Sequence, residues 1–199
     1  MEKYVITLTR QFGSMGRPIA RKMAEILGIE YYDRDIVEET SRKLNLPTSK
    51  ISKEEENARG SYFAMRFPLG AYTTDEQDKI FWTQRNIMLD LAYTRSCIIV
   101  GRCSDFILKD VPNCFRIHIY ATEEERFNNC VNMLLMSPED ARKSIAEVDR
   151  ARLAYHLRYA GYKPDDPEYK DIMINSSLLG VDKTAEYLCD LIRKKLGDS

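Results

Sequence analysis

This 199-residue sequence has almost no excess charge of either sign. Thirty lysines and arginines stand against 31 aspartates and glutamates, so the net charge is −1. That balance excludes a globally basic surface of the kind that binds nucleic acid or anionic membranes, so any polyanion must be bound locally. No apolar run approaches the roughly 18 residues that a membrane helix needs. We therefore expect a soluble, cytoplasmic protein with no nucleic-acid or membrane partner.

Patterns typical of disulfide frameworks and of metal sites are also missing. The five cysteines are odd in number and scattered, no two have C-x-x-C spacing, and there are only two histidines. We expect reduced, mostly buried thiols and no metal bound by protein ligands. His118 and His156 have no partner at catalytic or metal-binding spacing, so the sequence assigns them no role.

What the sequence does contain is a regular alternation of strand-like and helix-like segments. Its length suits one domain with an insertion. Strands are expected at 4–9, 30–32, 97–101, 114–120 and 171–174. Helices are expected as a first helix that ends at residue 28, one from 33 to about 44, one at 75–92, one that begins at about 122, one from 138 to about 160, and one at 181–196. The pattern weakens over 49–74, the candidate insertion. This alternation predicts an α/β fold with a mostly parallel sheet, whose ligand site lies beyond the carboxyl ends of the strands.

The segment RQFGSMGRP, residues 10–18, lies between the first expected strand and the first expected helix. Gly13 and Gly16 would let backbone N–H groups converge on phosphate oxygens at the helix N-terminus. The match to a full phosphate-binding loop is partial, because Arg17 replaces the usual lysine and Pro18 the magnesium-binding hydroxyl. An ordinary glycine-containing turn with a solvent-exposed arginine is the alternative. The position after the first strand favours phosphate binding.

Polar residues follow two more strands or interrupt an apolar helix face. Asp33 and Arg102 each come directly after an expected strand, at the edge where an α/β sheet collects its ligands. Alternatively, Asp33 only caps a helix and Arg102 is a surface side chain. Gln84 interrupts the apolar stripe of the helix at 75–92, as a locally satisfied core amide or as a group that faces the substrate.

The helix at 138–160 begins at Ser137, Pro138 and Asp140, a strong start signal. Arg152 falls in a gap of its apolar stripe, which consists of Ala141, Ile145, Val148, Tyr155 and Tyr159. Two interpretations stay open. Arg152 extends to solvent and pairs with Asp149, or the helix is a lid whose arginines close over phosphates: Arg142, Arg150, Arg152 and Arg158.

Together these segments resemble the cytidylate kinase-like family of P-loop kinases, relatives of the nucleoside monophosphate kinases. The resemblance rests on ITLTRQFGSMGRPIARKMAEILGIEYYDRDIV (6–37), FWTQRNIMLDLA with CIIVGRCSDFIL (81–108), and the span from VDRARLAY to YKDIMINSSLLG (148–180). It covers nearly the whole chain and is weakest over 50–78. It implies a single three-layer domain over 1–199 with a five-stranded parallel sheet flanked by helices. A helical insertion for the nucleotide acceptor is expected at about 45–92, and a lid helix at about 137–162.

The resemblance also implies a reaction, transfer of the γ-phosphoryl group of ATP to a nucleoside monophosphate, CMP or dCMP, with Mg²⁺ held mainly by phosphates and water. The donor phosphates would lie on the loop residues Gly13, Ser14, Met15, Gly16, Arg17 and Pro18. Arg17, Arg150 and Arg152 would act catalytically by neutralising phosphates. Asp33, Gln84, Arg102 and Asp149 would bind the acceptor. The partners would be small-molecule nucleotides, and either a monomer or a homodimer is compatible with the sequence.

Departures from the family pattern leave two other functions open. Because Arg17 and Pro18 stand in for a lysine and a hydroxyl, the chain could be a nucleotide-binding regulatory module that turns nothing over. It could also be a kinase for a different small-molecule acceptor. Asn128 and Asn129 occupy a region where kinases of this type often place another arginine.

Overall fold

The computed structural model describes residues 3–33, 35–44 and 74–197. Five parallel strands form one sheet in the order β2-β3-β1-β4-β5. They are β1 (Val5–Arg10), β2 (Glu30–Tyr32), β3 (Cys97–Val100), β4 (Cys114–Tyr120) and β5 (Ile172–Asn175). The predicted α/β fold with a five-stranded parallel sheet is thus confirmed.

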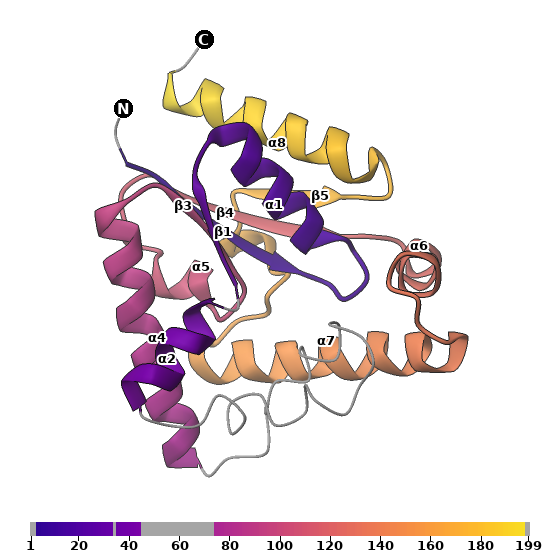
Figure 1. Ribbon diagram of the computed structural model, residues 1–199, viewed down its shortest axis with the longest axis horizontal. Coiled ribbons are helices and arrows are strands. Elements are labelled where there is room, and N and C mark those ends of the chain that lie inside the picture. Colours follow the sequence, from indigo (N-terminus) through magenta and orange to yellow (C-terminus); the bar gives the residue numbers. More distant parts are fainter. Residues whose placement is uncertain (1–2, 34, 45–73, 198–199) are drawn as a thin grey trace.

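Helices cover both faces of the sheet and complete three layers (Figure 1). On one face lie α1 (Gly16–Leu27) and α8 (Gly180–Leu196), whose apolar sides pack on alternate residues of the strands such as Ile6 and Leu8. On the other face lie α2 (Asp35–Leu44), α4 (Thr74–Thr94), α5 (Ser104–Ile107) and α7 (Pro138–Ala160). There the core includes Val5 and Phe81. Both faces of β1 and β3 are buried, which explains the continuous apolar sequence of β3.

Most element boundaries agree with the sequence prediction to within two residues, and three of the differences affect the site. The first strand extends to Arg10, because that residue still pairs with Ile119 of β4. The fifth strand ends at Asn175, opposite Tyr120. The second helix begins at Asp35, so Asp33 stands before it. The part of the predicted insertion at 45–73 lies outside the described residues, and the rest of it is α4 without its last two residues.

Helix α7 runs below the carboxyl ends of the strands, from α6 (Glu123–Asn128) at one end to α4 at the other (Figure 1). Its predicted start is confirmed, since the Ser137 hydroxyl accepts a hydrogen bond from the Asp140 N–H at 3.1 Å and Pro138 occupies the first turn. At its far end, the ring of Tyr159 stacks on Phe81 with centroids 4.0 Å apart. Between α6 and α7, a π-helical turn (Asn129–Met133) and a loop complete the connection.

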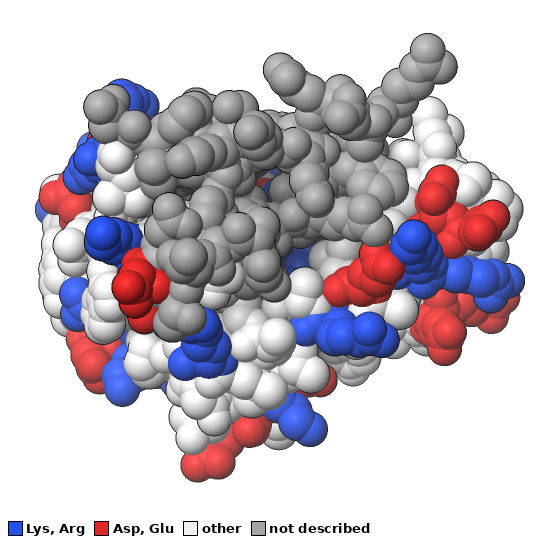
Figure 2. Space-filling model, turned by 90° about the horizontal axis from the view of Figure 1, so that it is seen from below, with Lys and Arg blue, Asp and Glu red and all other residues white. Residues whose placement is uncertain are grey.

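The charges on the α7 side of the molecule are mixed. Figure 2, which looks at this side, shows basic and acidic side chains interspersed rather than gathered by sign. This agrees with the near-zero net charge. In the ranges that the structure describes, no helix combines the length and the apolar character needed to cross a membrane.

Candidate functional site

The loop between β1 and α1 is fixed at both ends and bends where the sequence has glycine. The Gln11 N–H donates to the Ile119 carbonyl at 3.1 Å, which ties the start of the loop to β4. Gly13 has φ +78°, and a Cβ there would lie 2.7 Å from the Arg126 carbonyl oxygen. Met15 is left-handed (φ 59°), and α1 begins at the next residue. The loop therefore leads directly into a helix N-terminus with free backbone N–H groups, the arrangement that binds phosphate.

The side chain of Ser14 points into the fold. It is fully buried, and its hydroxyl donates to the carbonyls of Gln11 at 3.0 Å and Ile119 at 3.2 Å. The Ser14 carbonyl in turn accepts from the hydroxyl of Ser176, at the end of β5 (2.8 Å). Any contact of Ser14 with a donor phosphate would therefore come from its backbone.

The residues around this loop do not fit direct coordination of magnesium. Pro18 has no hydroxyl, and the Ser14 hydroxyl is already used. The nearby carboxylates of Asp33 and Asp149 are both engaged by arginines. No group of three or more histidines, cysteines, aspartates and glutamates that could hold a metal ion occurs in the described parts of the chain.

Asp33 lies at the centre of a buried cluster of arginines. It is 4% exposed, forms an ion pair with Arg17, and lies 3.9 Å from Nη2 of Arg10. The Tyr31 hydroxyl donates to the same carboxylate at 3.2 Å. Burial by itself would raise the pKa of Asp33, but the charges of Arg10, Arg17 and Arg102 outweigh it and hold that pKa below its ordinary value. Asp33 is therefore an ionised anchor for cations, not a helix cap.

Arg102 follows β3 as predicted and joins the same cluster. It has a left-handed backbone (φ 60°) directly after Gly101, which has φ +75°. Burial lowers the pKa of its guanidinium, while nearby Tyr155 and Asp33 favour the charged form. The residues that follow the carboxyl ends of β2 and β3 thus meet here, because these strands are neighbours in the sheet.

Of the four arginines predicted for a lid, only Arg152 reaches the loop. Its Nη1 donates to the Arg10 carbonyl at 2.9 Å. Arg150 is exposed and makes no ion pair or hydrogen bond with a described residue, since positions two apart on a helix point in different directions. Arg142 lies over the ring of Phe127, and Arg158 pairs with Asp78 of α4 at 2.8 Å. The catalytic roles of Arg17, Arg150 and Arg152 stay predictions.

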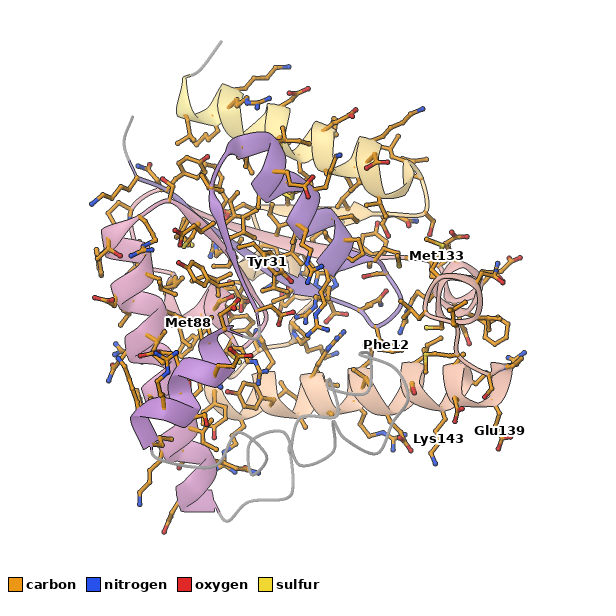
Figure 3. The ribbon with its side chains drawn as sticks, in the orientation of Figure 1. Phe12, Tyr31, Met88, Met133, Glu139 and Lys143 are labelled. Atoms are coloured by element: carbon orange, nitrogen blue, oxygen red, sulfur yellow. The ribbon has the colours of Figure 1, made fainter. Side chains whose placement is uncertain are left out.

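Asp149 binds the loop itself. Its Oδ1 accepts from the Phe12 N–H at 2.8 Å, and its Oδ2 pairs with Arg126 of α6. Nε of Arg126 donates to the Phe12 carbonyl at 2.7 Å. Asp149 and Arg126 thus bind the N–H and the carbonyl of Phe12, a loop residue that lies on the side of the loop facing α7 (Figure 3). Arg152 lies 3.6 Å from the same carboxylate, the pairing that the sequence left open. The predicted contact of Asp149 with the acceptor remains a prediction.

Arg126 is a site residue that the sequence interpretation missed. It lies only two to three positions before Asn128 and Asn129, where the family pattern suggested that an arginine was lacking. A comparison that allowed the arginine to lie two or three positions earlier would have found Arg126. Asn129 also contributes, because its amide donates to the Gly13 carbonyl at 3.0 Å.

Gln84 combines features of both predicted alternatives. Its side chain is fully buried, and its Oε1 accepts from the Tyr155 hydroxyl at 3.4 Å. Its Nε2 has no hydrogen-bond partner among the described residues. A buried donor without a partner is unfavourable by about 1–3 kcal/mol, so this nitrogen is available to an acceptor atom of a ligand.

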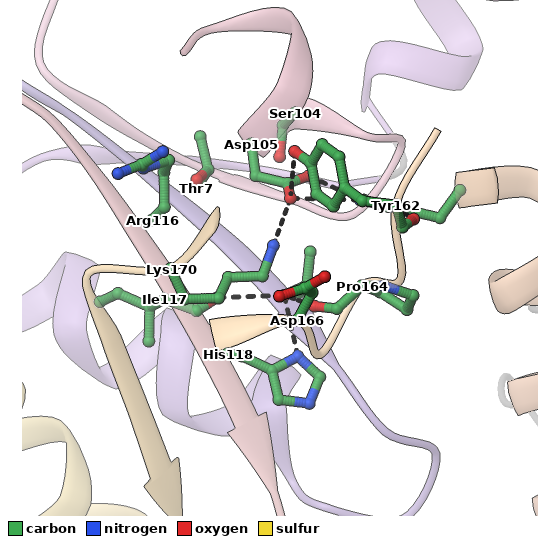
Figure 4. Close-up of polar contacts among 12 residues, drawn as sticks. Thr7, Ser104, Asp105, Arg116, Ile117, His118, Tyr162, Pro164, Asp166 and Lys170 are labelled. Atoms are coloured by element: carbon green, nitrogen blue, oxygen red, sulfur yellow. Dashed lines mark hydrogen bonds and ion pairs between the residues drawn. The ribbon is translucent and has the colours of Figure 1, made fainter. Parts of the chain in front are cut away.

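A second buried cluster surrounds Asp105, which lies on α5 and is 1% exposed. Lys170 pairs with its carboxylate, and the Tyr162 hydroxyl donates to it at 3.2 Å (Figure 4). Nε2 of His156 lies 3.1 Å from both oxygens. Nδ1 of His156 lies 2.8 Å from the Tyr162 carbonyl. The cluster connects α5, α7 and the segment before β5. No sequence spacing indicated it, since Asp105 and His156 are 51 positions apart.

Comparisons with known proteins support this fold. The chain is similar to an uncharacterised protein from Eubacterium ventriosum, with a TM-score of 0.71 and 23% identity, covering 96% of this chain and 98% of that one. It is also similar to a shikimate kinase from Acinetobacter baumannii in complex with shikimate, with a TM-score of 0.52 and 14% identity over 97% and 94% of the two chains. A gluconokinase from Sinorhizobium meliloti has a TM-score of 0.52 and 11% identity over 97% and 95%. At these identities the likeness establishes the fold, that of P-loop kinases.

Family membership comes from a separate comparison. No curated protein matches the chain. The model of the cytidylate kinase-like family matches residues 5–178, which include the glycine loop, all five strands and α7. The chain therefore belongs to the cytidylate kinase-like family, as its sequence motifs implied.

Proposed function

We propose that this protein is an ATP-dependent kinase that transfers a phosphoryl group to a nucleoside monophosphate, with CMP or dCMP as the first candidates. One observation carries the proposal. Four arginines converge beside the glycine loop at the carboxyl edge of the sheet, namely Arg10, Arg17, Arg102 and Arg152. Such a concentration of partly buried cations in a near-neutral chain suits a polyanionic substrate.

The proposed reaction is a direct displacement. An oxygen of the acceptor's phosphate attacks the γ-phosphorus of ATP, the bond from that phosphorus to the β,γ-bridging oxygen breaks, and ADP leaves. Arginines and backbone N–H groups neutralise the phosphoryl oxygens, so catalysis consists of positioning and electrostatic stabilisation without a covalent intermediate. Arg17 offers a planar, two-pronged donor in place of lysine's point charge. Magnesium would arrive bound to the phosphates of ATP and to water.

The site divides naturally between the two substrates. The donor phosphates would lie on the backbone from Gly13 to Pro18, at the N-terminus of α1. The acceptor would lie near Asp33, Arg102 and Gln84. Arg152, which donates to the carbonyl of Arg10, would stand between the two.

A different small-molecule acceptor is the second candidate. The fold is shared with proteins described as a shikimate kinase and a gluconokinase. In the acceptor region, Gln84 Oε1 already accepts a bond from Tyr155, and Nε2 is the atom that remains available. A regulatory nucleotide-binding module is the third, because Arg17 is paired with Asp33 and Pro18 lacks a hydroxyl.

An ADP-release assay with Mg²⁺ and ATP tests all three candidates. The acceptor panel is CMP, dCMP, UMP, AMP and GMP, followed by shikimate and gluconate. We expect the highest kcat/KM with CMP or dCMP, and loss of transfer in Arg17→Met. Turnover only with a non-nucleotide acceptor would favour the second candidate. ATP binding without consumption in any mixture would overturn the kinase proposal in favour of the regulatory module.

A further inference from the structure

Arg10 is a largely buried cation to which the proposed function assigns no specific contact. It is the last residue of β1, and its side chain is 9% exposed. The nearest carboxylate oxygen among the described residues is that of Asp33, 3.9 Å from Nη2. Its Nε is buried and has no hydrogen-bond partner within the described part of the chain. A guanidinium has five N–H donors, and this one is therefore available to an acceptor atom of a ligand.

Two glycines form the walls around this side chain. A Cβ on Gly16 would lie 2.9 Å from Cβ of Arg10, and a Cβ on Gly101 would lie 2.5 Å from its Nη1. Gly16 opens α1, and Gly101 follows β3. The aliphatic part of the Arg10 side chain therefore lies beside the start of the phosphate-binding helix, and its guanidinium lies beside the end of β3, close to Arg102.

Several cations gather around Arg10. The guanidiniums of Arg10, Arg17 and Arg102 all act on the carboxylate of Asp33 and lower its pKa. Burial lowers the pKa of Arg10 to about 10, so it is still charged at neutral pH. A phosphate monoester carries roughly −1.5 to −2 charges at pH 7, and such an anion is attracted to a group of cations of this kind.

We propose that Arg10 is a phosphoryl-binding residue, whose guanidinium holds the oxygens of a nucleotide phosphate between the first turn of α1 and the end of β3. The inference rests on the proposed function, since it assumes that the ligand is a nucleotide. The phosphate could come from the donor ATP or from the acceptor monophosphate, and the two share the same chemistry. On this account Gly101 is needed because a larger residue would displace the guanidinium, and Gly16 is needed because it leaves room for the aliphatic part of the Arg10 side chain.

The test measures binding, which does not require turnover. Titration calorimetry compares wild type and Arg10→Met with four ligands: the non-hydrolysable β,γ-imido analogue of ATP, CMP, and the nucleosides adenosine and cytidine. We expect Arg10→Met to weaken binding of at least one phosphate-bearing ligand by about tenfold or more, with nucleoside affinities unchanged. Loss for the ATP analogue assigns Arg10 to the donor, and loss for CMP assigns it to the acceptor. Arg10→Lys should recover part of the affinity.

Gly101→Ala provides a second variant that keeps the arginine. The new methyl group would displace only the flexible end of the Arg10 side chain, so the protein should fold. Gly28→Ala is its matched control, because Gly28 has a similar positive φ (+65°) and open space around its Cβ position. Both variants should lose similar stability from backbone strain. Only Gly101→Ala should weaken binding of the phosphate-bearing ligand.

Two results from the variants would overturn the inference. One is unchanged nucleotide affinity in both Arg10→Met and Gly101→Ala. The other is an equal loss for nucleotides and nucleosides, which would indicate a structural role only. Pyrophosphate serves as a further probe, and the inference also fails if wild type binds none of the phosphate-bearing ligands. Failure of the proposed function is a separate result: binding that depends on Arg10 without any ADP release would leave the inference standing and the kinase proposal wrong.

Discussion

Two buried charged clusters of this protein differ in how completely their polar atoms are paired. Around Asp105, the side chains of His156, Tyr162 and Lys170 each have at least one partner. Around Asp33, the Nε of Arg10 lacks a partner among the described residues. The same holds for Nε2 of Gln84 in the predicted acceptor region. Within the described part of the chain, unpartnered buried atoms also occur at Nε2 of His118 and Oγ1 of Thr184, so the donors of Arg10 and Gln84 point to a ligand because of their place in the candidate site.

The largest effect is expected from a substitution that breaks the ion pairs around Asp105. Asp105→Asn removes the one carboxylate that faces Lys170 and His156, and leaves a buried ammonium without its counter-charge. We expect a loss of about 3–5 kcal/mol in the free energy of unfolding, measured by urea denaturation. Asp171→Asn is the control, since its pair with Arg116 is partly exposed and should contribute only about 1 kcal/mol or less. Equal losses in the two variants would contradict the distinction.

The next prediction concerns how the free energy of unfolding depends on pH through His118, which lies beside the cluster around Asp105. Burial, followed by the charge of Lys170, lowers the pKa of His118 to about 4. In the unfolded chain a histidine takes up its proton near pH 6.5, so the unfolded state binds protons more readily than the folded state. Stability is therefore complete above pH 6.5 and falls between about pH 6.5 and 4, by up to about 3 kcal/mol. His118→Gln should flatten that slope in urea titrations at several pH values, and identical slopes would refute this account.

A third test addresses the cluster with unpaired donors. Arg152→Met should lower kcat/KM by about 100-fold or more, the scale expected for loss of a group that stabilises transition-state charge. Stability should change little, because Asp149 keeps Arg126 and the Phe12 N–H as partners. Arg158→Met, on the same helix but paired with exposed Asp78, should retain activity. Marked unfolding of Arg152→Met would instead favour a structural pair with Asp149.

The smallest effect concerns the acceptor. Gln84→Leu removes the unpartnered Nε2 at nearly constant volume, but it also removes the Oε1 that accepts from the Tyr155 hydroxyl, so the two effects offset and the free energy of unfolding should change little. If this nitrogen binds the acceptor, the acceptor's KM should rise about tenfold while the KM for ATP is unchanged. Thr83→Val is the neighbouring control, because its hydroxyl bonds only to the Lys79 carbonyl of the same helix. An unaltered acceptor KM would assign Gln84 to the core.

Much of the candidate site could be predicted because it lies at strand ends. Asp33 and Arg102 each follow a strand, and parallel strands bring their carboxyl ends to one edge. Arg10 could have been found the same way, had the first strand been extended by one residue. Arg126 and the cluster around Asp105 required the fold, since their partners are far away in the sequence.

The amino-acid sequence by itself determined the alternation of strands and helices, the glycine loop after the first strand, and the start of the long helix at Ser137. Each of these depends on local periodicity, backbone conformation or capping, which neighbouring residues decide. Only the tertiary structure decided which arginines meet the loop. Arg152 faces it and Arg150 does not, because α7 packs through Ala141 and Val148 and that packing sets the rotation of the helix. A cation's role depends on the partners it meets in space, and those partners come from distant parts of the chain.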